Sequence, residues 1–96
     1  MPCTIKWSTR SLRDIKRLTD FLQEKNPQAA QQAAKKIQQG VLTISSQPNI
    51  GVALPDQSGR REYFLPFGKG NYVIRYRQKD NLIAILRVFH SREYRQ

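Results

Sequence analysis

The first quarter of the chain changes from strand-like alternation to a helical spacing of apolar residues. Residues Thr4 to Trp7 alternate between polar and apolar side chains, which predicts a short strand. Apolar side chains then recur every three or four residues, which predicts an amphipathic helix of about four turns. Its stripe consists of Leu12, Ile15, Leu18 and Leu22, widened by Phe21. Either Ser8 or Ser11 can cap this helix, and Asp14 stands three residues after Ser11, as in a capping box.

A second helix follows almost at once. Asn26-Pro27 separates the two helices, because proline disfavours helix at the preceding residue and suits the first position of a new one, which Asn26 can cap. We expect this helix to run from Pro27 to about Ser46. Its predicted inner face carries Ala30, Ala33, Ala34, Ile37, Val41 and Ile44. So short a connection makes the helices antiparallel, and the alanines let their axes approach closely.

The remaining half of the chain is punctuated by turn residues and contains three predicted strands. Pro, Gly, Asp and Ser are frequent between Gln47 and Gly59, which indicates a loop. Each strand that follows is bounded by a turn, the first at residues 66–71 and the second at Lys79-Asp80-Asn81. The predicted strands are Arg61 to Leu65, Tyr72 to Arg77 and Leu82 to Phe89.

This order of elements predicts the fold class. A β-α-α-β-β-β chain of 96 residues fits a single α+β domain over residues 1–96, with an antiparallel helix hairpin on one face of a mainly antiparallel sheet. The other face of the sheet is then open. Alternation along the middle strand places Arg75 and Arg77 on the face opposite Tyr72, Ile74 and Tyr76. We expect both arginines on the open face, joined there by residues of the flanking strands, Arg61 and Arg87.

Composition narrows the function classes. Seventeen Lys and Arg against seven Asp and Glu give a formal net charge of +10, which favours a polyanionic or acidic partner. One cysteine and one histidine exclude an internal disulfide, a multi-cysteine zinc module and a multi-histidine metal site, so we expect neither metal nor cofactor. No apolar run is long enough for a membrane span, and the first residues lack the apolar core of a secretion signal. The sequence therefore predicts a cytoplasmic protein without a membrane partner.

Together these segments resemble a known family. The element order, Trp7-Ser8 at the end of the first strand, Asn26-Pro27 followed by paired alanines, and the block from Arg61 to Arg92 are similar to the ParE/RelE superfamily of bacterial type II toxins. The most specific part is Gly70-Asn71-Tyr72-Val73-Ile74-Arg75-Tyr76 followed by Ile85-Leu86-Arg87-Val88-Phe89-His90-Ser91-Arg92-Glu93. The resemblance covers nearly the whole chain, and it implies a toxin that is neutralised by a tightly bound acidic antitoxin.

The resemblance implies two alternative targets. ParE-like members inhibit DNA gyrase, whereas RelE-like members cleave messenger RNA on the ribosome without a metal ion. RelE-like chains carry an arginine directly after the tyrosine that opens the third strand, and here that position is Val73. This difference and the two long helices favour the ParE branch. In the ribonuclease alternative, His90 would serve as acid or base, and Tyr94 would stack on a base or assist proton transfer. Arg75, Arg87 or Arg92 would hold phosphate.

The predicted binding residues are largely independent of that choice. We expect carboxylates of the antitoxin, or the target, to contact Arg61, Arg75, Arg77, Arg87, His90 and Arg92, while apolar residues of the antitoxin cover the sheet or the helix hairpin. A third hypothesis is a plain nucleic-acid-binding module that uses the positive field. It lacks the stacked aromatic side chains or the recognition helix of known nucleic-acid readers.

Overall fold

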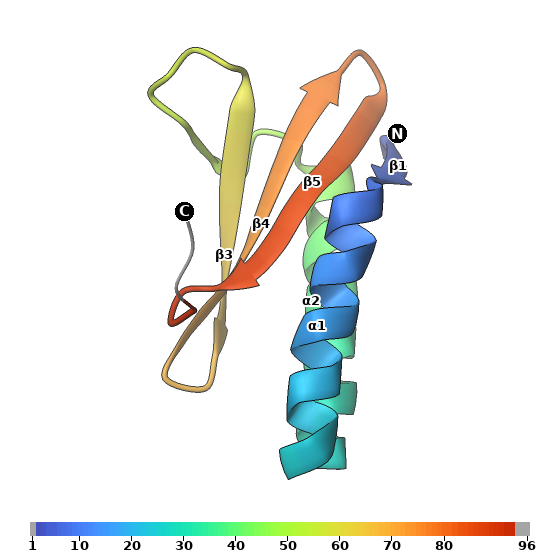
Figure 1. The fold of residues 1–96 in the computed structure, drawn as a ribbon. Coiled ribbons are helices and arrows are strands. Elements are labelled where there is room, and N and C mark those ends of the chain that lie inside the picture. Colours follow the sequence, from blue (N-terminus) through green and yellow to red (C-terminus); the bar gives the residue numbers. More distant parts are fainter. Residues whose placement is uncertain (1, 94–96) are drawn as a thin grey trace.

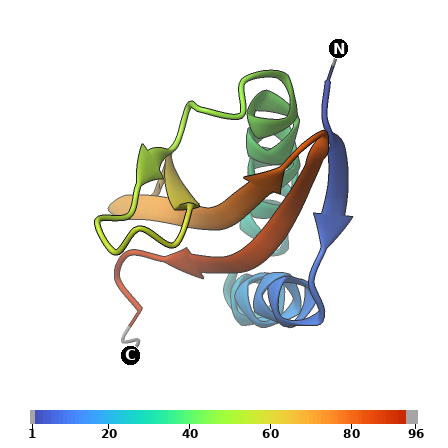
Figure 2. The same cartoon turned by 90° about the horizontal axis from the view of Figure 1, so that it is seen from above.

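Residues 2–93 are described by the computed structural model, and they form two layers (Figures 1 and 2). The chain runs β1 (Thr4–Trp7), α1 (Thr9–Lys25), α2 (Pro27–Ser46), β2 (Val52–Ala53), β3 (Arg60–Phe67), β4 (Gly70–Lys79) and β5 (Leu82–His90). The strands form one sheet in the order β1-β5-β4-β3-β2, in which only β1 and β5 are parallel. The predicted α+β class, with a helix hairpin against a mainly antiparallel sheet, is confirmed. The strand β2 lies within the predicted loop and was missed.

Both helix starts use the caps that the sequence offered. Ser8 is the N-cap of α1: its Oγ accepts from the Ser11 backbone N–H at 3.0 Å and donates to the Leu86 carbonyl at 3.0 Å. Asn26 ends α1 through its N–H to the Leu22 carbonyl and caps α2 through Oδ1 to the Ala29 N–H at 3.3 Å. The prediction of a capping box formed by Ser11 and Asp14 was wrong, because both residues lie within α1, after its N-cap, and both are buried.

The inner face of α1 is narrower than its apolar stripe. The sequence predicted that Leu12 and Phe21 belong to the inner face, but Leu12 is 54% exposed and Phe21 is 61% exposed, so neither lies in the core. Instead Ser11, Asp14 and Leu18 form the buried line of the helix. The reason is position: α1 follows directly on β1 and runs beside β5, near the edge of the sheet, so only one flank of the helix faces inward (Figure 2).

The helix α2 covers the centre of the sheet. Of its predicted inner residues, Ala34 alone is exposed, and Gly40 and Ser45 are buried in addition. Gly40 permits the close approach of α2 to β3 and β4, because a Cβ there would lie 2.5 Å from Leu65 Cδ1 and 3.1 Å from Ile74 Cδ1.

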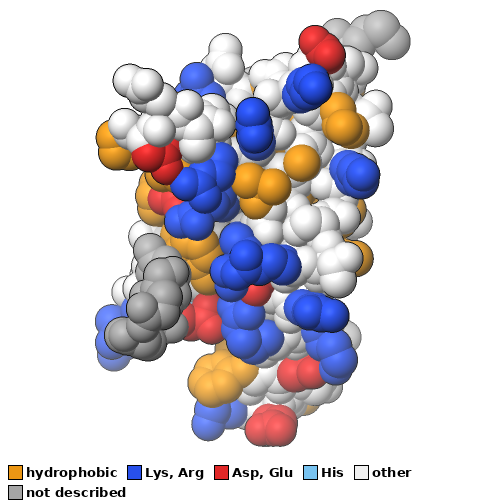
Figure 3. Space-filling model, turned by 45° about the horizontal axis from the view of Figure 1, so that its top comes forward, with side chains coloured by type: hydrophobic (Ala, Val, Ile, Leu, Met, Phe, Trp, Pro, Cys, Tyr) orange, Lys and Arg blue, Asp and Glu red, His pale blue; other side chains and the backbone are white. Residues whose placement is uncertain are grey.

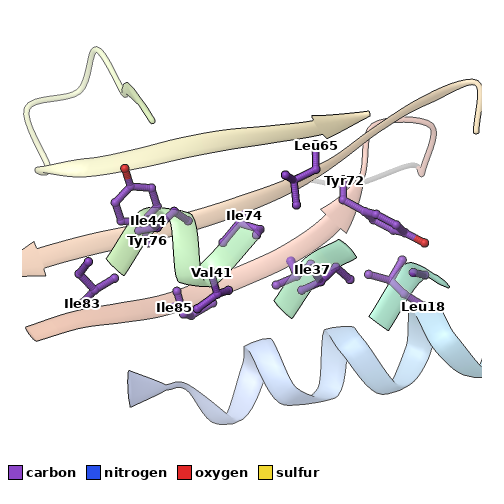
Figure 4. Close-up of a cluster of buried hydrophobic side chains, with 12 residues drawn as sticks. Leu18, Ile37, Val41, Ile44, Leu65, Tyr72, Ile74, Tyr76, Ile83 and Ile85 are labelled. Carbon is purple, nitrogen blue, oxygen red and sulfur yellow. The ribbon is translucent and has the colours of Figure 1, made fainter. Parts of the chain in front are cut away.

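The core lies between this hairpin and the sheet (Figure 4). It is built from side chains that alternate along the strands, with Tyr72, Ile74 and Tyr76 from β4 facing Ile37, Val41 and Ile44 of α2. The other buried members of this cluster are Leu18, Ala33, Leu65, Ile83, Ile85 and Val88. Within residues 2–93, no helix is long and apolar enough to cross a membrane.

A bulge in β5 sets the pairing with β4. Arg75 pairs with Arg87 and Tyr76 pairs with Ile85, so Leu86 is the extra residue on β5. The Ser8 hydroxyl bonds to the carbonyl of this residue, which ties the bulge to the start of α1. Because of the bulge, Ile85 and Val88 both face the helices, three residues apart, and Arg87 keeps the same face as Arg75.

Candidate functional site

The open face of the sheet carries three of the four predicted arginines. Arg75, Arg77 and Arg87 share this face, since Arg75 pairs with Arg87 and Arg77 follows Arg75 by two residues. The prediction for Arg61 was wrong. Arg61 pairs with Tyr76 and so faces the helix side, where its guanidinium donates to the Gly51 carbonyl at 2.7 Å and holds the loop before β2.

Two of these arginines already have acidic partners. Arg75 donates to Glu62 on the neighbouring strand at 2.7 and 2.9 Å and lies 5.5 Å from the centre of the Phe89 ring. Arg87 donates to Asp14 of α1 at 2.8 and 3.1 Å. Like charges directly opposite on adjacent strands repel. Arg75 and Arg87 form such a pair, and each is neutralised by its own carboxylate.

Asp14 is the centre of a buried charge network. Its side chain accepts from Arg87, from Arg17 at 2.6 Å and from the Val88 backbone N–H at 2.8 Å, and the residue is only 3% exposed. Burial opposes its ionisation, but the hydrogen bonds from Arg87, Arg17 and Val88 outweigh that effect and hold the pKa of Asp14 below its usual value. This network was missed in the sequence. The signal in the sequence was an acidic residue, Asp14, at helical spacing between Ser11 and Leu18, the other two buried residues of α1.

Glu93 extends the network to the C-terminal turn. Its carboxylate accepts from Arg17 at 3.0 and 3.2 Å and from the His90 backbone N–H at 2.8 Å. Burial raises the pKa of Glu93, but the hydrogen bonds from Arg17 and His90 prevail and lower it overall. Beyond the segment paired with β1, the outer edge of β5 is thus covered by side chains. The Ser8 side chain binds the backbone of Leu86, those of Asp14 and Arg17 bind the backbone of Val88, and that of Glu93 binds the backbone of His90.

A groove of about 600 Å³ lies between the C-terminal half of α1 and the β3–β4 turn, which diverge at the lower end of Figure 1. Apolar and aromatic side chains form most of its lining, namely Leu18, Phe21, Leu22, Phe67 and Tyr72. Arg17, Lys69 and Arg92 add positive charge, and Gly68, His90 and Glu93 complete the lining. Burial and the charge of Glu93 raise the pKa of Tyr72 to about 12, so its hydroxyl stays protonated at neutral pH.

His90 holds two segments together at the end of this groove. Its Nδ1 accepts from the Arg92 backbone N–H at 3.2 Å, which assigns the ring proton to Nε2, and Nε2 lies 3.0 Å from the Phe67 carbonyl oxygen. The ring also packs edge-on against Tyr72, with centroids 5.2 Å apart. Both nitrogens of His90 therefore bind backbone atoms of the turns on either side.

Two of the residues predicted for RNA cleavage, His90 and Arg75, are not brought together. His90 pairs with Tyr72 and faces the helix side, whereas Arg75 lies on the open face and binds Glu62. Arg92 does lie near His90, exposed on the C-terminal turn. Tyr94 lies outside the described residues. Among residues 2–93 there is no group of three or more His, Cys, Asp or Glu side chains that could hold a metal ion.

Comparison with known proteins identifies the family. The model of the ParE toxin of the type II toxin-antitoxin system, parDE, matches residues 5–94. The chain belongs to this toxin family. Curated relatives from Caulobacter vibrioides include Toxin RelE1 and Toxin RelE2. Toxin RelE1 is 32% identical over 95 residues, which cover 99% of this chain and all of the relative. Toxin RelE2 is 29% identical over 87 residues, which cover 91% of this chain and 93% of the relative.

Solved structures show the same fold. The chromosomal ParDE system from P. aeruginosa has a chain that matches with a TM-score of 0.71 at 23% identity, over 92% of this chain and 95% of that one. The toxin-antitoxin complex RelBE2 from Mycobacterium tuberculosis matches with a TM-score of 0.63 at 24% identity, over 94% of this chain and 99% of that one. The ParE/RelE resemblance noted in the sequence is confirmed.

Proposed function

We propose that this toxin inhibits DNA gyrase by binding it, with no chemistry of its own, and acts in the cytoplasm. The observation that carries the proposal is the engagement of His90. Its two ring nitrogens bind the backbones of Arg92 and Phe67, so neither is presented to a substrate as a proton donor or acceptor. The match to the ParE model over residues 5–94 agrees with this target.

A supercoiling assay with purified full chain and gyrase tests the proposal. We expect relaxed plasmid to stay relaxed, or cleaved DNA to accumulate, as the toxin concentration approaches that of gyrase. Unchanged supercoiling at a large molar excess of toxin would refute the proposal.

The names of the curated relatives favour a second candidate, a ribosome-dependent messenger RNA endonuclease of the RelE type. In that case the toxin added to a translation extract should cut messages, and His90→Ala should abolish the cuts. Since His90 also holds two turns, the variant needs a melting curve that confirms folding at the assay temperature. Intact messages with the wild-type toxin would eliminate this candidate.

We further propose an acidic antitoxin as the partner of the groove. The similar solved structures are a ParDE system and a RelBE2 complex. Phe21, Leu22 and Phe67 give the groove an apolar lining for an amphipathic segment, and Lys69 and Arg92 supply cations for its carboxylates. Contacts of the antitoxin with Arg61, Arg75 and Arg87 would have to displace the intramolecular partners of these side chains, whereas Arg77 and Arg92 are exposed.

Two exposed apolar residues give a matched test of the groove. Phe21 is 61% exposed and lines the groove, whereas Leu42 on α2 is 63% exposed and does not. If the antitoxin covers the groove, Phe21→Ala should weaken binding of the acidic protein encoded beside the toxin gene by about 30-fold, the loss of a central aromatic contact. Leu42→Ala should leave the affinity within about twofold. Calorimetric titration measures both, and equal losses would contradict the docking site.

A further inference from the structure

A row of basic side chains crosses the open face of the sheet, nearer to the β4–β5 turn than the ion pairs Arg75–Glu62 and Arg87–Asp14. Lys6 of β1 pairs with Ala84 of β5, Ala84 pairs with Arg77 of β4, and Arg77 pairs with Arg60 of β3. Residues that pair directly carry their side chains on the same face. Three basic residues and one alanine therefore stand side by side on four adjacent strands.

The row is extended along β4. Lys79 lies two residues beyond Arg77 on the same face, a separation of about 7 Å, and Lys6 lies two strands from Arg77, a separation of about 10 Å. Ala84, between Lys6 and Arg77, is too small to screen them. We call Lys6, Arg77 and Lys79 the cationic triad. Lys and Arg side chains gather on the side of the molecule that Figure 3 shows.

The triad lacks the neutralisation that the other basic residues of this face have. Arg60 binds Asp56 at 2.6 Å, Arg75 binds Glu62 and Arg87 binds Asp14. In the part of the chain that the structure describes, no carboxylate forms an ion pair with Lys6, Arg77 or Lys79, and all three are exposed. Arg77 also stands directly opposite Arg60, an arrangement that is unfavourable for folding and that a bound anion would relieve.

We propose that the cationic triad binds the phosphodiester backbone of a nucleic acid, separately from the antitoxin groove. Long, exposed Lys and Arg side chains on a flat surface suit phosphate groups, each of which accepts one or two charge-assisted hydrogen bonds. An acidic peptide would need an apolar anchor as well, and within residues 2–93 the apolar residues that pair with members of the triad are Ala84 and Leu82. Contacts to the backbone carry no base readout, so the binding is independent of sequence.

This inference does not depend on gyrase inhibition, and its test uses no gyrase. Fluorescence anisotropy measures binding of the full chain to a short labelled DNA duplex and to a single-stranded RNA of equal length. With three phosphate contacts, log Kobs should fall with log salt at a slope of about −2.7 for the DNA duplex, which is a loss of about 40-fold in affinity between 50 and 200 mM salt, and at about −2.1 for the single strand. Equal binding of both probes identifies backbone charge alone, and a preference for one of them identifies the source of the phosphates.

Two double variants of equal charge separate local contacts from the general positive field. Lys6→Gln with Arg77→Gln removes two members of the triad, whereas Lys35→Gln with Lys36→Gln removes two positive charges from α2. The first variant should reduce the slope by about two, so that the same salt change costs only about fourfold. The second should keep the wild-type slope. The single variant Arg77→Gln, expected to reduce the slope by about one, replaces the first double variant if that one fails to fold.

Several outcomes would overturn the inference. Equal losses in the two double variants would show that only the net charge of the chain matters. No binding of either probe at low salt, or an unchanged slope without Lys6 and Arg77, would exclude phosphate contacts at the triad. Binding of an acidic peptide that is lost in the Lys6→Gln, Arg77→Gln variant, with no binding of DNA or RNA, would assign the surface to a protein partner instead. Phe21→Ala should leave the binding of nucleic acid unchanged, since the groove is a separate surface.

Discussion

Replacing Asp14 by asparagine removes one negative charge from the buried network while keeping the shape of the side chain. Asp14 receives hydrogen bonds from Arg17, Arg87 and the Val88 N–H, and asparagine has one acceptor oxygen in place of two. Breaking a buried ion pair by removing one partner costs about 3–5 kcal/mol. The Arg17 and Arg87 side chains are 44% and 29% exposed, so water can partly solvate them once they are unpaired. We therefore expect a loss of about 2–3 kcal/mol in the free energy of unfolding.

Urea unfolding, followed by circular dichroism and the fluorescence of the single Trp7, measures this loss. In a domain of this size it corresponds to a decrease of roughly 10–20 °C in Tm. Asp20→Asn is the matched control on the same helix. Asp20 binds Lys16 at 2.6 Å, but its side chain is 60% exposed, and the loss of an exposed pair should stay below about 0.5–1 kcal/mol.

The pH dependence of the Asp14→Asn effect gives a second, independent check. The pKa of Asp14 is lower in the folded state than its ordinary value of 3.8, so ionised Asp14 stabilises the fold above that pH. This stabilisation is lost as the pH falls through the folded-state pKa. The difference between wild type and variant should therefore be constant near neutral pH and shrink below about pH 4. A difference under about 0.5 kcal/mol at pH 7, or one that persists unchanged at acid pH, would refute the assignment of Asp14 as a buried charged anchor.

Three further predictions concern aromatic residues and the loop before β2. Tyr76→Phe should cost about 1–3 kcal/mol in urea unfolding, because the hydroxyl accepts from the buried Gly51 N–H at 2.9 Å and donates to the Pro48 carbonyl at 2.7 Å; an unchanged midpoint would contradict this. Gly51→Ala should also destabilise by about 1–3 kcal/mol in the same assay, since a Cβ there would lie 2.7 Å from the Tyr76 hydroxyl oxygen, and wild-type stability would show that the loop shifts freely. In an NMR titration of labelled tyrosines, Tyr72 should ionise with a pKa of about 12, and ionisation near 10 would show that its ring is open to water.

For the arginines of the sheet, the sequence indicates the face on which each side chain lies but not its acidic partner. Alternation along β4 correctly assigned Arg75 and Arg77 to the open face. The same alternation along β3 places Arg61 on the face of Tyr63 and Leu65, so its helix-side position was available from the sequence and was overlooked. For Arg87 the sequence predicted the face but not the partner, because Asp14 lies 73 residues away in the chain.

The sequence by itself determined the elements and their layers. Apolar spacing defined two helices and four strands, and Asn26-Pro27 fixed the sharp reversal between the helices, because periodicity and capping are properties of neighbouring residues. Tertiary structure decided the surfaces. The pairing of β1 with β5 places Lys6 two strands from Arg77 on one face, and the bulge at Leu86 keeps Arg87 beside Arg75. Buried Asp14 supplies the counter-charge for Arg87. Such contacts join residues far apart in the chain, and no turn sets the register of strands that are not neighbours in sequence, such as β1 and β5.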